Sequence, residues 1–190
     1  MRWRSIKQIV NGRTTSRTVY KERVVPSCDR YPVRSGQATA RLIVDHIPST
    51  TSNNRRPGHK LVATTFTIHN TGNPTSSAAN ERSWLTNPSN KTTASYHIVV
   101  DEHESIQCLT LNESSWATGD GINGSGNRTS IRIELCESGD YTNILNRAVS
   151  LVAEMLKERG WGVDRLHWHY DWRRLRRTCT VKSAPGSCDM

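Results

Sequence analysis

The chain has 190 residues, of which 34% are hydrophobic, and its mean hydropathy is −0.65. This length is enough for one domain with its own core, and no apolar run of about 18 residues is present, so a membrane-spanning helix is not expected. The formal net charge of +9 favours an anionic partner, such as a nucleic acid, a membrane surface or an anionic wall polymer.

Residues 1–41 form a basic N-terminal segment, with ten lysine or arginine residues against two acids, Glu22 and Asp29. Apolar periodicity is weak here, so we expect an extension ahead of the folded domain. A solvated arm and an anion-binding surface are both compatible with this composition. The first residues are basic, but no apolar segment follows them, so a secretory signal peptide is not expected.

The first clear strand is predicted at residues 62–68, where apolar and hydroxylated side chains alternate. A short apolar segment at residues 41–48 and a polar loop at 49–58 precede it. The pattern stops at His69, before residues typical of a loop. His69 therefore lies where a core strand opens into a loop, a common place for a functional side chain, although a structural histidine bonded to nearby backbone is the alternative.

The middle of the chain predicts a short helix at residues 76–85, followed by a hairpin. Residues 95–101 are strongly β-prone, and residues 104–109 are their expected partner. The glycine-rich stretch at 116–127 lacks the spacing of a phosphate-binding loop, so it does not indicate a nucleotide site.

A strand at residues 130–136 and a long helix come next. Glu134 is expected on the strand face opposite to its isoleucines. Asp140 and Gly160 are the predicted caps of the helix. Between the caps, an amphipathic stripe is expected in the core, made of Leu145, Ala148, Val149, Val152, Met155 and Leu156. This order of elements predicts an α/β fold with a mixed central sheet.

The five cysteines are widely spaced and odd in number, with no CxxC pair. This pattern does not indicate a disulfide framework or a zinc finger. We expect mostly free thiols, with Cys136 buried in the core.

Two histidines and a cysteine, His69, His169 and Cys179, are a plausible catalytic zinc set with water in the fourth position. Glu134 lies between them in the sequence and could act as general base. From the spacing alone, chance assembly of common residue types is the simpler explanation.

A series of short motifs nevertheless resembles, in order, the type 2 N-acetylmuramoyl-L-alanine amidases, the zinc amidases of phage endolysins and bacterial autolysins. The motifs are FTIHNT (66–71), SYHIVVDE (95–102), IQ (106–107), LNE (111–113), WATGDG (116–121), GNRTSI (126–131), IELC (133–136) and HYDW (169–172). The resemblance covers roughly residues 42–172, which we take as the catalytic domain. It implies a mixed sheet flanked by helices, as in peptidoglycan recognition proteins, with a zinc cleft at one sheet face.

The resemblance also implies roles for individual residues. His69 and His169 match zinc ligands, and Glu134 matches the catalytic glutamate. Tyr96 matches a position that is a catalytic tyrosine in some relatives. His97 matches a recurrent histidine, which we expect to be structural.

The segment after Trp172 departs from the family pattern. Cys179 corresponds to the third zinc ligand, and Arg177 stands where the family has a lysine that assists the oxyanion. The nine residues between His169 and Cys179 are a longer spacing than usual in the family. Either an insertion still brings Cys179 to the metal, or residues 173–190 are a divergent Arg-rich tail that has lost the third ligand.

The resemblance predicts a zinc-dependent enzyme that hydrolyses the amide between the lactyl group of N-acetylmuramic acid and L-alanine in peptidoglycan. We expect a monomer, of phage or prophage origin, made in the cytoplasm and acting on the cell wall after release, with anionic wall polymers as possible further partners. A non-catalytic or decayed peptidoglycan-binding protein of the same fold is the alternative. A nucleic-acid binder is supported by charge alone, so no specific nucleic-acid partner is expected.

Overall fold

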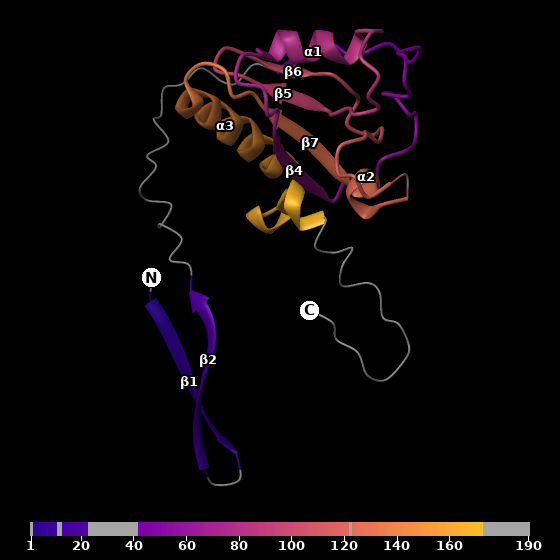
Figure 1. The fold of residues 1–190 in the computed structure, drawn as a ribbon. Helices are drawn as coiled ribbons and strands as arrows, with labels where there is room; N and C mark the ends of the chain where they lie inside the picture. The colour runs from indigo at the N-terminus through magenta and orange to yellow at the C-terminus, as the bar shows by residue number, and fades with distance from the viewer. Residues whose placement is uncertain (1, 11–12, 23–41, 122, 173–190) are drawn as a thin grey trace. The chain divides into compact units, whose positions relative to one another are not determined.

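The computed structural model describes residues 2–10, 13–22, 42–121 and 123–172 (Figure 1). The chain divides into two compact units, residues 1–36 and 37–190. In the first unit, β1 (Arg2–Val10) and β2 (Arg13–Glu22) form an antiparallel hairpin. The weak alternation of apolar residues in this segment did not predict these strands. The expected tail at residues 173–190 lies outside the described residues.

The second unit contains a six-stranded mixed sheet of strand order β3-β6-β5-β7-β4-β8, which confirms the predicted α/β class. Its strands are β3 (Leu42–Val44), β4 (Thr65–Asn70), β5 (Ile98–Val100), β6 (Ser105–Gln107), β7 (Ser130–Leu135) and β8 (Leu166–Trp168). Strands β5 and β6 are antiparallel, as expected of the predicted hairpin, and the other neighbouring pairs are parallel. Every residue of β5 and β7 is buried, so both faces of the central strands are covered.

The strand predicted to stop at His69 begins later and runs further than expected. β4 starts at Thr65, which leaves Val62 exposed, and it continues through His69 to Asn70. Pairing with β7 extends to its last residue, Asn70 with Leu135. His69 therefore lies within the hydrogen-bonded strand, paired with Glu134 of β7.

The helices are α1 (Ala78–Thr86), α2 (Ser125–Thr129), α3 (Tyr141–Arg159) and the 3₁₀ turn η2 (Val163–Arg165); residues 169–172 are also helical. Helix α1 packs on β5 and β6, and α3 packs on β5 and β7 (Figure 1). The predicted caps of α3 are confirmed, because Asp140 accepts a hydrogen bond from the Thr142 N–H at 2.8 Å and Gly160 has a φ of 64°. Among the described residues, no helix is long and apolar enough to cross a bilayer.

The buried face of α3 differs from the predicted stripe. Its buried residues are Ile144, Ala148, Leu151, Val152, Met155 and Leu156. Leu145 and Val149 were expected in the core, but they are 39% and 54% exposed. The apolar arc of this helix is wider than the surface that packs on the sheet, so periodicity alone did not show which edge is covered.

Shortening a side chain on the buried face of α3 should lower the free energy of unfolding more than shortening one on its exposed edge. Leu151 is 3% exposed, so Leu151→Ala should lower the free energy of unfolding by about 2–5 kcal/mol. Leu145→Ala, on the exposed edge, should change it by less than about 1 kcal/mol. Urea unfolding of both variants tests this, and equal losses would contradict the observed orientation of the helix.

Candidate active site

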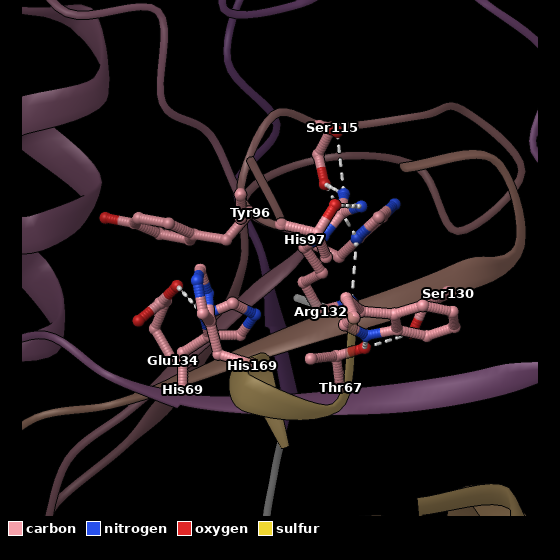
Figure 2. Close-up of polar contacts among 12 residues, drawn as sticks. Thr67, His69, Tyr96, His97, Ser115, Ser130, Arg132, Glu134 and His169 are labelled. Atoms are coloured by element: carbon pink, nitrogen blue, oxygen red, sulfur yellow. Dashed lines mark hydrogen bonds and ion pairs between the residues drawn. The ribbon is translucent and has the colours of Figure 1, made fainter. Parts of the chain in front are cut away.

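The register of two parallel strands places His69 beside Glu134. The two residues are partners in the β4–β7 ladder, so their side chains leave the sheet on the same face. Both residues are only 8% exposed. His69 Nδ1 lies 3.8 Å from Glu134 Oε1, as Figure 2 shows.

His169 reaches the same point from the edge of the sheet. Strand β8 pairs in parallel with β4, with Trp168 opposite Ile68, and His169 follows at once. Its Nδ1 lies 3.1 Å from His69 Nδ1, and the two rings are nearly perpendicular, at 82° (Figure 2). The structure thus brings together three of the residues singled out in the sequence, His69, Glu134 and His169.

Burial determines the charges in this group. It lowers the pKa of His69 to about 3, with smaller contributions from His169 and Arg132, so the imidazole is neutral at pH 7. Burial also raises the pKa of Glu134 to about 8; the charge of Glu81 acts in the same direction, and that of Arg132 opposes it. Neutral imidazoles are the form in which histidine binds metals.

Two ligands of a metal site fit this geometry. The facing Nδ1 atoms are 3.1 Å apart, close to the roughly 3.3 Å expected of two nitrogens bound to one tetrahedral zinc. His69 Nε2 is buried and has no hydrogen-bond partner among the described residues. No set of three or more His, Cys, Asp or Glu residues that could hold a metal is found in residues 42–121 and 123–172, and Cys179 and Arg177 lie outside the described part of the chain.

Tyr96 lines the same cleft but directs its hydroxyl group to α1. The hydroxyl donates to the backbone carbonyl of Glu81 at 2.8 Å and lies 3.3 Å from Glu81 Oε2. Burial raises the pKa of the Tyr96 phenol well above its usual value. Tyr96 therefore contributes to the wall of the cleft, with its one proton already engaged.

His97 has the structural environment that the sequence led us to expect. It is fully buried, and its Nδ1 accepts a hydrogen bond from the backbone N–H of Arg132 at 3.0 Å. Its Nε2 then carries the single N–H proton of the neutral ring, which it donates to the Glu113 carbonyl at 2.8 Å. Both ring nitrogens are occupied by these contacts.

The cleft around the histidines has a volume of about 420 Å³. Its walls come from β4 and the loop after it, α1, the segment before β5 and the glycine-rich loop. The lining residues are His69, Asn70, Thr71, Asn73, Glu81, Trp84, Ala94, Ser95, Tyr96, Ala117, Glu134 and His169. The sequence did not identify Glu81 or Trp84 as site residues; their spacing of three on a predicted helix, which places them on one face, was the available signal.

A hydrogen-bonded link joins the two segments that carry the histidines. The Trp172 indole N–H donates to Thr67 Oγ1 at 2.8 Å. The same Thr67 hydroxyl contacts Ser130 Oγ, and Figure 2 shows these two side chains together. Thr67 lies two residues before His69, and Trp172 lies three after His169. The link therefore fixes the segment that contains His169 relative to the strand that contains His69.

Arg132 holds the glycine-rich loop that forms another wall. Its guanidinium group is fully buried and donates to the Ser115 and Gly126 carbonyls, at 2.7 and 2.6 Å, and to Asn127 Oδ1 at 2.6 Å. A Cβ on Gly126 would lie 2.9 Å from the Trp172 ring, so only glycine allows this close approach. The loop is thereby packed against the segment that carries His169.

A mixed sheet that brings two histidines and a buried glutamate to one cleft presents the donor set that metallohydrolases use. Residues 57–187 match the family model described as N-acetylmuramoyl-L-alanine amidase. The chain therefore belongs to the N-acetylmuramoyl-L-alanine amidase family. The match continues past Trp172, where the motif resemblance ended, and includes position 179.

Individual relatives agree with this assignment. The chain is 50% identical over 111 residues to the N-acetylmuramoyl-L-alanine amidase XlyB of Bacillus subtilis, a match that covers 56% of this chain and 34% of that protein. The amidase XlyA of the same organism is 39% identical over 135 residues, covering 69% of this chain and 44% of XlyA. The chain thus spans about a third to a half of the length of these curated relatives.

The solved catalytic domain of XlyA is similar along almost its full length. It superposes with a TM-score of 0.64 at 38% identity, over 73% of this chain and 94% of that domain. A mutant endolysin from Bacillus subtilis gives a TM-score of 0.65 at 36% identity, again over 73% and 94%. The similarity thus covers nearly all of both solved chains.

The link between Thr67 and Trp172 should be measurable as stability. Thr67→Val keeps the shape of the side chain but leaves the buried indole N–H unpaired, so the free energy of unfolding should fall by about 1–3 kcal/mol. Thr67→Ser keeps the hydroxyl group and should lose less. Equal losses in denaturant unfolding would show that the hydroxyl contributes nothing.

Proposed function

We propose that this chain is a zinc-dependent N-acetylmuramoyl-L-alanine amidase, which hydrolyses the amide between the lactyl group of N-acetylmuramic acid and L-alanine in peptidoglycan. Family membership supports the reaction and the substrate. The observation that carries the proposal is the convergence of His69, Glu134 and His169 in one cleft.

His69 and His169 are the proposed zinc ligands. Cys179 is proposed as the third, because the family match includes its position. When bound, zinc supplies a Lewis acid that polarises the scissile carbonyl and lowers the pKa of a bound water. The ring of His169 is held at this place by β8 before it and by Trp172 after it.

Glu134 is the proposed general base. Its carboxylate accepts no hydrogen bond from a protein group in the described part of the chain, and it faces the cleft beside His69. In its ionised form it is placed to take a proton from the attacking water and to return it to the leaving amine. Arg177 is proposed to donate a hydrogen bond to the oxyanion, and Tyr96 to form the wall that orients the substrate.

The charge of the chain supports a wall-associated role. A net charge of +9 would attract the protein to anionic wall polymers, and this long-range attraction requires no specific contact. We propose that the chain acts on the cell wall as a monomer, with peptidoglycan as its substrate.

Replacement of the proposed base should separate catalysis from metal binding. Glu134→Gln should reduce the release of L-alanine amino termini from purified peptidoglycan by at least about a hundredfold, because the amide cannot accept and return the proton. Its zinc content should equal that of the wild type. The matched control is Glu154→Gln, an exposed position on α3.

Full activity of Glu134→Gln would remove Glu134 from the role of base. A wild-type protein that is folded and sediments with peptidoglycan, but releases no amino termini, would favour the non-catalytic binding protein. New reducing sugar ends in place of amino termini would indicate a different bond specificity.

Metal removal should abolish the reaction reversibly. A zinc chelator should stop the release of amino termini, and added Zn²⁺ should restore it. Cys179→Ala should weaken zinc binding by at least about tenfold in a competition assay, because a ligand is lost. Cys188→Ala, its control in the same segment, should bind zinc as the wild type does. Equal affinities of the two variants would exclude Cys179 from the metal site.

A further inference from the structure

The cleft contains a second carboxylate, that of Glu81 on α1. Glu81 is 9% exposed, and it lines the cleft together with Glu134. None of the described lining residues is a lysine or an arginine. The cleft thus has acidic but no lysine or arginine side chains among its described lining residues, in a chain whose net charge is strongly positive.

The carboxylate of Glu81 is poorly satisfied by the protein. Within the described part of the chain, the carboxylate contacts the Tyr96 hydroxyl, 3.3 Å from Oε2. That hydroxyl has one proton, and the Glu81 carbonyl is the nearer acceptor at 2.8 Å. The neighbouring Arg82 pairs with Asp45 instead, at 3.0 Å. A carboxylate that lines a cleft without a neighbouring cation or a good donor can accept hydrogen bonds from a ligand.

The position of Glu81 is fixed rather than adaptable. Arg55 is fully buried and donates to the carbonyls of Leu85 and Asn87, at 2.9 and 3.2 Å, at the end of α1. Its guanidinium group also lies 5.5 Å from the centre of the Trp84 ring. Since the end of the helix is held in this way, Glu81 and Trp84 form a pre-organised wall of the cleft.

A second anion at this wall would be repelled. Glu81 lines the cleft together with Glu134, and its charge helps to raise the pKa of Glu134, so it disfavours a further negative group there. A substrate group with N–H donors would instead complete the hydrogen bonding of Glu81. The wall therefore distinguishes an amide from a carboxylate, two groups of nearly the same shape.

We propose that Glu81 is a specificity-determining residue, which accepts hydrogen bonds from an amide of the peptide next to the scissile bond and rejects a free carboxylate at that place. This inference rests on the proposed amidase function. The substrate class that follows is muramoyl peptides whose acidic residue after L-alanine is amidated.

The test compares two synthetic substrates that differ at one group. Both are muramoyl dipeptides, and the residue after L-alanine carries either a primary amide or a free carboxylate. The wild type should cleave the amide form with a kcat/KM at least about tenfold higher, mainly through a lower KM. In Glu81→Gln, the preference should fall to within about threefold, because the acidic substrate gains.

If the role of Glu81 were purely structural, its replacement would change the amount of folded, zinc-loaded protein. The ratio of the two kcat/KM values does not depend on that amount. Glu158→Gln, exposed on α3, is the matched control and should keep the wild-type ratio. An unchanged ratio in Glu81→Gln, or no preference in the wild type, would overturn the assignment of Glu81. Failure of the wild type to cleave either substrate or intact peptidoglycan would instead overturn the proposed function.

Discussion

The parallel pairing of β4 with β7 is the constraint on which the cleft depends. It places His69 opposite Glu134 on one face of the sheet, although 64 residues separate them in the chain. A shift of one residue in this register would send the Glu134 side chain to the opposite face, because side chains alternate along a strand. β8 extends the same ladder on the other side of β4 and brings His169 to the same point. The site is thus a property of three neighbouring strands and of no single segment.

Buried polar side chains on these strands hold the neighbouring loops in place by hydrogen bonds. The side chain of Arg132, on β7, holds the glycine-rich loop against the sheet by hydrogen bonds to Gly126 and Asn127. Thr67, on β4, accepts a hydrogen bond from the indole N–H of Trp172 and so holds the segment that follows His169. Leaving any of these buried groups unpaired would cost on the order of 1–3 kcal/mol, so the strands and loops are stable only in combination. The residues that hold the walls are therefore on the same strands that carry the catalytic candidates.

The net charge of the chain contrasts with the residues that line the cleft. The chain as a whole is strongly basic, which favours its approach to anionic polymers. The cleft, in contrast, is lined by Glu81 and Glu134 and by no cation among its described residues. Under the proposed function, attraction to a wall would come from the net charge of the chain, and selection of a bond within it from the cleft.

Local patterns in the sequence determined a large part of this protein. The alternation that defines β4, the hairpin of β5 and β6, the caps Asp140 and Gly160, and the α/β class all follow from interactions within a few residues. The candidate residues His69, Glu134 and His169 were also visible, through ordered motifs. Tertiary structure alone decided that Leu145 and Val149 lie on the exposed edge of α3, that the three-residue β8 joins the sheet, and that Glu81 and Arg132 are buried. These features depend on strand register and on packing between distant segments, and the local periodicity of a chain carries no information about either.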